Sequence, residues 1–124
     1  MKILLVNGET VDKQRLAAIL DALGNEHSLT IISILADGER YGSELAKEVG
    51  ISRPLLYLHL KKLENVGLVE SEIRHFEEPP YTKKFYKAKN FELTLSLNKI
   101  REIVKQEEKY VTNANDGLGG RIEH

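Results

Sequence analysis

The sequence predicts a mainly α-helical fold with a small β-hairpin, an α+β winged helix-turn-helix, and three observations carry this prediction. Ala46 and Gly50 have the spacing needed where two short helices cross closely and the chain then turns. A helix with a regular apolar stripe follows that turn. Two strand-like runs come next, joined through Pro79 and Pro80, which indicates a hairpin, the wing, with a stiff tip.

The first elements precede this unit. Residues 1–6 read as a short strand followed by a turn at Asn7 and Gly8. A first helix begins near Thr10 or Asp12 and ends at Gly24. It carries an amphipathic stripe at i, i+3, i+4 and i+7, made of Leu16, Ile19, Leu20 and Leu23.

The segment from Asn25 or Ser28 to Ala36 is rich in β-branched residues, and local propensity alone would allow a strand. We predict a helix, because the segment has the length of one and ends at Asp37-Gly38. The residues expected on its apolar face are Leu29, Ile32 and Leu35.

The helix after the turn is predicted at residues 53–66, capped by Ser52, with Pro54 in its first turn. Leu56, Leu60 and Leu63 form its buried stripe. The opposite face combines cations, a phenol and apolar groups, which suits phosphates, guanine edges and thymine methyls in a major groove. The candidate DNA-binding residues of this segment are Ser52, Arg53, Pro54, Tyr57, Leu58, Lys61 and Lys62. A merely solvated face is the alternative.

The hairpin strands are predicted at residues 68–77 and 81–89. Arg74, Lys83 and Lys84 are the candidate contacts to the DNA backbone, although lysines also keep a sheet edge soluble. Residues 52–89 carry eight Lys and Arg against five Asp and Glu, whereas the whole chain has a net charge of -1. The candidate contact region is therefore the positive part of an otherwise acidic chain.

A last helix is predicted from Ser96, its cap, to about Val111. So small a domain leaves it little to pack on, which suggests pairing with the first helix and with a second subunit. The candidate dimerisation residues are Leu16, Ile19, Leu20, Leu23, Ile100, Ile103 and Val104. We expect residues 1–111 to form one domain and residues 112–124 to form a flexible tail.

Composition excludes several classes of chemistry. The chain has no cysteine, which excludes disulfides, thiolate zinc sites and thiol catalysis. The four histidines never recur at i, i+3 or i+4, and no carboxylate pair stands out as a metal or acid/base set. We therefore expect no enzyme, no metal and no cofactor. No apolar run is long enough for a signal peptide or a membrane span, so a cytoplasmic location is expected.

The runs ALGNEHSLTIISIL, ELAKEVGIS and LHLKKLENVGLV, between Ala22 and Val69, resemble winged-helix regulators of the ArsR type. The resemblance implies a homodimer that binds DNA and regulates transcription, with His59 matching a structural histidine of the family. Tyr41-Gly42 and Leu56-Tyr57 also look like the PadR type, the second choice. Known metal sites of ArsR-like sensors use Cys in the helix matching residues 43–49, or Asp and His in the last helix. Residues 43–49 lack Cys and residues 98–111 lack His, so neither site is supported.

The leading hypothesis is thus a homodimeric regulator that reads double-stranded DNA with the helix at 53–66 and touches the backbone with the hairpin. The alternative is a winged helix that binds another protein and no DNA, suggested by the nearly neutral charge and by the apolar patch of Pro54, Leu55, Tyr57 and Leu58. The sequence does not indicate a small-molecule effector.

Overall fold

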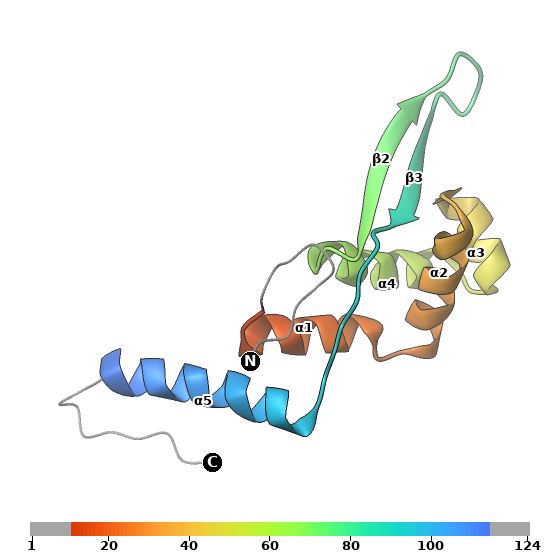
Figure 1. Cartoon of the computed structure of the whole chain (residues 1–124). Coiled ribbons are helices and arrows are strands. Elements are labelled where there is room, and N and C mark those ends of the chain that lie inside the picture. Colours follow the sequence, from red (N-terminus) through yellow and green to blue (C-terminus); the bar gives the residue numbers. More distant parts are fainter. Residues whose placement is uncertain (1–10, 115–124) are drawn as a thin grey trace. The chain divides into compact units, whose positions relative to one another are not determined.

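The computed structural model describes residues 11–114, with side chains through residue 106. It confirms the predicted class, since the described residues form mainly helices together with one small antiparallel sheet (Figure 1). The elements in chain order are α1 (Lys13–Leu23), α2 (Glu26–Asp37), β1 (Arg40–Tyr41), α3 (Gly42–Val49), α4 (Arg53–Asn65), β2 (Val69–His75), β3 (Thr82–Ala88) and α5 (Leu97–Ala114). The predicted strand at residues 1–6 and the end of the predicted tail lie outside the described residues.

The described residues fall into two compact units. Residues 17–90 form one unit, which holds the helix-turn-helix and the whole sheet. The other contains the described residues before 17 and from 91 onward, including α5. In that second unit Ser96 caps α5, because its hydroxyl accepts a hydrogen bond from the Lys99 amide at 3.1 Å. Ile103 is buried there, whereas Ile100 and Leu97 are exposed.

Short polar residues cap two helices of residues 17–90, α2 and α4, as their sequence suggests. Asn25 caps α2 by accepting from the amides of His27 and Ser28 at 2.8 and 3.3 Å. Ser52 caps α4 by accepting from the Leu55 amide at 3.3 Å. The predicted start of α4, with Ser52 as its cap, is therefore confirmed.

The sheet has three strands in the order β1-β3-β2. Of the three strands of this sheet, the sequence predicted the two of the hairpin, each slightly longer than observed, and it missed β1. A two-residue strand carries no periodic signal, and it is defined here by pairing with Tyr86 and Phe85, far along the chain. The amide of Phe76 donates a hydrogen bond to the Tyr81 carbonyl at 2.7 Å, just beyond the last paired residues, His75 and Thr82.

The apolar stripe predicted on α4 is confirmed: Leu56 and Leu63 are fully buried, and Leu60 is nearly so. The face predicted for α2 was partly wrong. Leu35 is buried as expected, but Ser28 and Ile31 complete the buried side and Leu29 is 56% exposed. Ser28 can lie on the core side because its hydroxyl is next to the buried His59 of α4 rather than to solvent.

Candidate nucleic-acid interface

The turn between α3 and α4 sets the direction in which α4 leaves α3. Gly50 has φ 82°, in the left-handed region, and its amide donates to the Ala46 carbonyl at 2.8 Å. A Cβ at Gly50 would meet no atom within 4 Å, so the backbone conformation alone calls for glycine there. Ala46 is buried, as a close helix crossing requires.

The face of α4 opposite its buried stripe is open to solvent. Leu58 is 55% exposed and Tyr57 is 42% exposed. The remaining candidates of this segment are also exposed, namely Ser52, Arg53, Pro54, Lys61 and Lys62. Their positions on one short helix bring them together on one side, as the helical period predicted.

Ion pairs divide the candidate cations into two groups. Lys62 is paired with Asp21, with 3.1 Å between Nζ and Oδ2, and Arg74 is paired with Glu39 and Glu72. Within residues 11–106, Arg53, Lys61, Lys83 and Lys84 have no carboxylate partner. The cations without a carboxylate partner are the ones that can meet phosphate without first breaking an ion pair within the protein.

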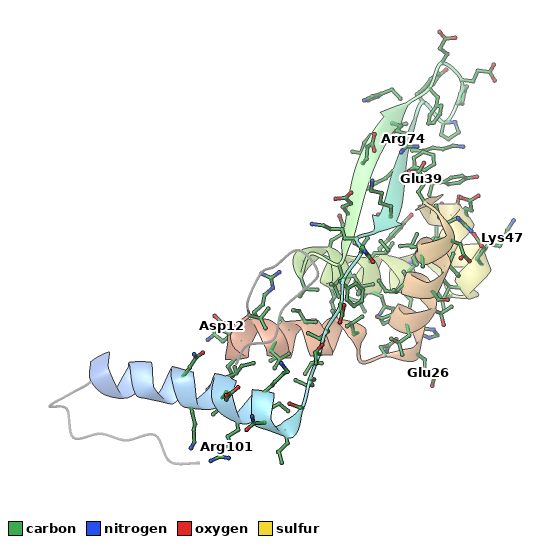
Figure 2. All side chains as sticks on the ribbon, viewed as in Figure 1. Asp12, Glu26, Glu39, Lys47, Arg74 and Arg101 are labelled. Atoms are coloured by element: carbon green, nitrogen blue, oxygen red, sulfur yellow. The ribbon has the colours of Figure 1, made fainter. Side chains whose placement is uncertain are left out.

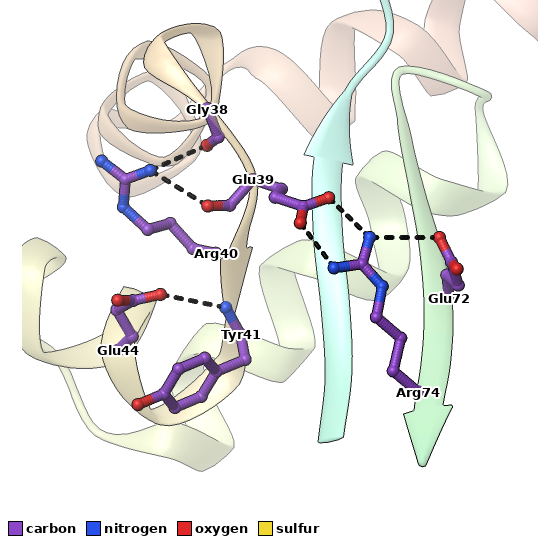
Figure 3. A network of polar contacts seen from close by, with 7 residues as sticks. All are labelled: Gly38, Glu39, Arg40, Tyr41, Glu44, Glu72 and Arg74. Carbon is purple, nitrogen blue, oxygen red and sulfur yellow. Dashed lines mark hydrogen bonds and ion pairs between the residues drawn. The ribbon is translucent and has the colours of Figure 1, made fainter. Parts of the chain in front are cut away.

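Arg74 is held by Glu39 and Glu72 (Figures 2 and 3), and it also lies over an aromatic ring. Its Nη1 and Nη2 donate to the two carboxylate oxygens of Glu39 at 2.6 and 2.8 Å, and Nη2 also donates to Glu72 at 3.3 Å. The guanidinium lies 4.3 Å from the ring centre of Phe85. These bonds raise the pKa of Arg74 and, because Arg74 donates to it, lower the pKa of Glu39. The guanidinium thus ties the hairpin to the loop before β1.

Next to this pair, Arg40 braces the same loop (Figure 3). Its Nη1 donates to the carbonyls of Gly38 and Glu39, each at 3.0 Å, and its Nε donates to Glu48 at 2.7 Å. Hydrogen bonding to Glu48 raises the pKa of Arg40. Sequence reasoning missed the role of Glu39, since the partners Glu39 and Arg74 are 35 residues apart.

Replacing Arg74 with glutamine should loosen the hairpin, because the paired donors to Glu39 and the stacking on Phe85 are both lost. We expect amide hydrogen exchange to become several-fold faster in β2 and β3, with little change in α4. Lys87→Gln is the matched control, since within the described residues the ion pair of Lys87 is with Glu70, at 3.4 Å on the exposed sheet surface, and Lys87 makes no hydrogen bond to Glu39. Unchanged hairpin protection in the Arg74 variant would contradict this role.

Lys83 and Lys84 lie on opposite faces of the hairpin, because neighbouring strand residues alternate. Lys83 is opposite Arg74 in the ladder, and its Nζ lies 4.3 Å from the ring centre of Tyr41. Lys84 is opposite Ile73 and is exposed, with its Nζ 5.6 Å from the ring centre of Tyr86. Of the two lysines, Lys84 is the less confined.

His59 belongs to the interior of the helix-turn-helix. It is 8% exposed, and its Nδ1 lies 3.4 Å from the hydroxyl of the buried Ser28. Its Nε2 is buried and has no hydrogen-bond partner among the described residues. Burial lowers the pKa of His59, and the nearby charges of His27 and Lys62 lower it further. A neutral, structural histidine fits these surroundings.

The lowered pKa of His59 predicts a loss of stability in mild acid. When the pH falls below about 6.5, the ordinary pKa of histidine, the unfolded chain takes up a proton that folded His59 resists. This loss is absent above that pH. Urea unfolding at pH 7.5 and 5.5 should show a smaller acid-induced loss in His59→Gln than in the wild type. His75→Gln, which removes an exposed histidine, should behave like the wild type, and equal losses in all three proteins would refute the assignment.

Two other kinds of site are absent from the described part of the chain. It contains no group of three or more His, Cys, Asp or Glu residues placed to hold a metal ion. None of its helices combines the length and the apolar character needed to cross a bilayer.

Comparison with known proteins points to one family. Residues 26–71 match the family model described as "Bacterial regulatory protein, arsR family". A protein of Methanocaldococcus jannaschii, named as an uncharacterized HTH-type transcriptional regulator, is 38% identical over 87 residues, which cover 70% of this chain and 90% of that protein.

Solved structures agree with this result. HlyU from Vibrio cholerae is 25% identical, with a TM-score of 0.50, and the match covers 82% of this chain and 99% of HlyU. A Mycobacterium bovis domain, described as a homodimeric winged helix-turn-helix DNA-binding domain, is 21% identical with a TM-score of 0.51. That match covers 90% of this chain and 89% of the domain, and it supports the fold.

Proposed function

Because the chain belongs to the ArsR family of winged-helix transcription regulators, we propose that it acts as a homodimer that binds a specific sequence of double-stranded DNA. In this proposal α4 enters the major groove and the β2–β3 hairpin lies on the flanking backbone. Two half-sites about one helical turn apart would be read by the two copies. The family consists of regulators rather than enzymes, and the proposal contains no catalytic step. It includes a cytoplasmic location, where the DNA of bacteria and archaea is found.

The observation that carries the proposal is the open face of α4. Arg53 and Lys61 have no carboxylate partner within residues 11–106, and Leu58 between them is 55% exposed. Unpaired cations beside an exposed apolar side chain suit a groove that offers phosphates, guanine edges and thymine methyls. The fully buried Leu56 on the opposite side holds this face outward.

Fewer cations of the hairpin are available to contact the DNA backbone than its composition suggests. Lys84 is exposed and unpaired within the described residues, and Lys83 is stacked on rings but has no carboxylate partner. Arg74 remains a candidate only if DNA can compete with Glu39. We therefore assign the main phosphate contact of the hairpin to Lys84.

Dimerisation is supported by the homodimeric form named for the Mycobacterium bovis domain. The seven proposed contacts differ in exposure within this chain. Leu16, Ile19 and Ile103 are buried, and Leu23 and Val104 are half-buried. Leu20 and Ile100 are exposed, at 39% and 41%, and are the most available to a second copy.

The test is fluorescence anisotropy with duplex DNA from upstream of the chain's own gene and with a scrambled duplex, each at two salt concentrations. Tighter binding to the first duplex, with a steeper salt dependence on the second, is expected for sequence-specific recognition. Equal binding to both would call for selection from a random duplex library. If selection enriches no sequence, the proposal of specific recognition fails.

Absence of binding to any duplex at low salt would instead favour the protein-interaction alternative. The exposed Tyr57 and Leu58, next to Pro54, would then be the surface to test against a protein partner that co-purifies at a fixed ratio.

A further inference from the structure

Tyr57 is the aromatic residue on the open face of α4, and its phenol end is turned back onto α3. A Cβ added to Gly42, the first residue of α3, would collide with the Tyr57 hydroxyl oxygen. The same Cβ would lie 3.1 Å from both Cε1 and Cζ of the ring. The hydroxyl end of Tyr57 therefore occupies the space that any other side chain at position 42 would need.

The backbone of Gly42 does not require glycine. The described glycines with positive φ are Gly38, Gly50 and Gly67, and Gly42 is not among them. Gly42 is also buried at the start of a helix, where alanine would suit the helix better. Space for the phenol is thus the structural reason for a glycine at this position.

The position next to Gly42 fixes where the phenol end of Tyr57 lies, since its hydroxyl oxygen, Cζ and Cε1 are the atoms beside α3. Tyr57 is nevertheless 42% exposed, so part of the residue stays open to solvent.

Resting on the DNA-binding function proposed above, we propose that Gly42 holds the Tyr57 hydroxyl against α3, so that Tyr57 meets DNA with its ring and selects a thymine methyl. An aromatic ring in the major groove can contact the C5-methyl group that distinguishes thymine from the other bases. Gly42 is then a positioning residue for sequence preference, although it touches no DNA itself.

The proposal predicts different behaviour for two Tyr57 variants. The probe is the tightest duplex that the wild type selects from a random library, and the measurement is anisotropy at fixed salt. Tyr57→Phe should bind this duplex within about twofold of the wild type, because only the hydroxyl is lost. Tyr57→Ala should bind about a hundredfold more weakly, because each copy of the homodimer loses one good base contact worth about tenfold. A Phe variant as weak as the Ala variant would mean that the hydroxyl makes the contact, and would overturn the inference.

Replacing single thymines of the probe by uracil removes one methyl group at a time. One such replacement should weaken wild-type binding about fourfold, the effect of one buried methyl group. That effect should vanish in Tyr57→Ala and persist in Leu58→Ala, the matched control with an exposed leucine next in the chain. If Leu58→Ala removes the effect and Tyr57→Ala keeps it, the methyl contact belongs to Leu58 and the inference is wrong.

Gly42→Ala tests the positioning role. It should keep the fold, as judged by circular dichroism and thermal melting, and lose the uracil effect. In a double-mutant cycle it should add no further loss of affinity to Tyr57→Ala, because its effect passes through that ring. An additive loss would overturn the positioning role. Failure of the wild type to select any sequence would count against the proposed function, whereas selection with an unchanged Tyr57→Ala variant would count against this inference alone.

Discussion

Replacing Leu56 with alanine is expected to lower the free energy of unfolding by about 2–5 kcal/mol, as for other fully buried leucines. Leu56 is completely buried on the inner side of α4, in a core that includes Leu45 of α3 and Leu60. The lost methyl groups leave a cavity between the two helices of the helix-turn-helix, and tight packing allows it to collapse only in part. Urea unfolding followed by circular dichroism measures the change.

The matched control is Leu58→Ala, on the same helix but 55% exposed. It should change the free energy of unfolding by less than about 0.5 kcal/mol. Its effect should appear in DNA affinity instead. Comparable losses of stability in the two variants would show that the inner and outer faces of α4 are assigned incorrectly.

Changing Arg53, Lys61 and Lys84 together to glutamine is expected to remove most of the salt dependence of DNA binding. Each phosphate contact contributes about 0.9 to the slope of log K against log salt. If all three cations meet phosphates in both copies of a homodimer, the slope should fall by about 5. Between about 50 and 200 mM salt, the wild type should then lose on the order of 10³-fold more affinity than the variant. Anisotropy titrations on one duplex measure both slopes.

Lys62→Gln with Lys87→Gln is the control for this experiment. Both lysines are exposed, but Lys62 is paired with Asp21 and Lys87 with Glu70. Removing these two lysines should lower the slope of log K against log salt by less per removed charge than removing Arg53, Lys61 and Lys84 does. An equal effect per charge would mean that overall charge, rather than unpaired cations at the interface, governs binding.

Short-range patterns predicted the parts of the fold that depend on neighbouring residues. The cap at Ser52, the turn at Gly50 and the buried stripe of α4 follow from one or two turns of chain, and the structure has all of them. The hairpin could be predicted in the same way, from two strand-like runs with Pro79 and Pro80 between them.

The features that the sequence did not predict depend on contacts between distant segments. Nothing near Arg74 indicates that Glu39 binds it, because β3 brings the two segments together. The inward position of Ser28 is explained by His59, which lies in another helix and contacts the serine hydroxyl. The exposed face of α4 could be predicted from the helical period, but the orientation of Tyr57 depends on the space left at Gly42.

The short strand β1 has a consequence for the kind of DNA that can be bound. It pairs with β3 through Arg40 and Tyr41 and runs directly into α3, so the hairpin and the helix-turn-helix share backbone hydrogen bonds. In the proposed complex, the distance between the major groove that α4 would enter and the backbone that Lys84 would contact is therefore set by the protein. A duplex must match that distance through its own twist and groove width. Base pairs that no side chain touches would then affect affinity through the shape and stiffness that they give the DNA.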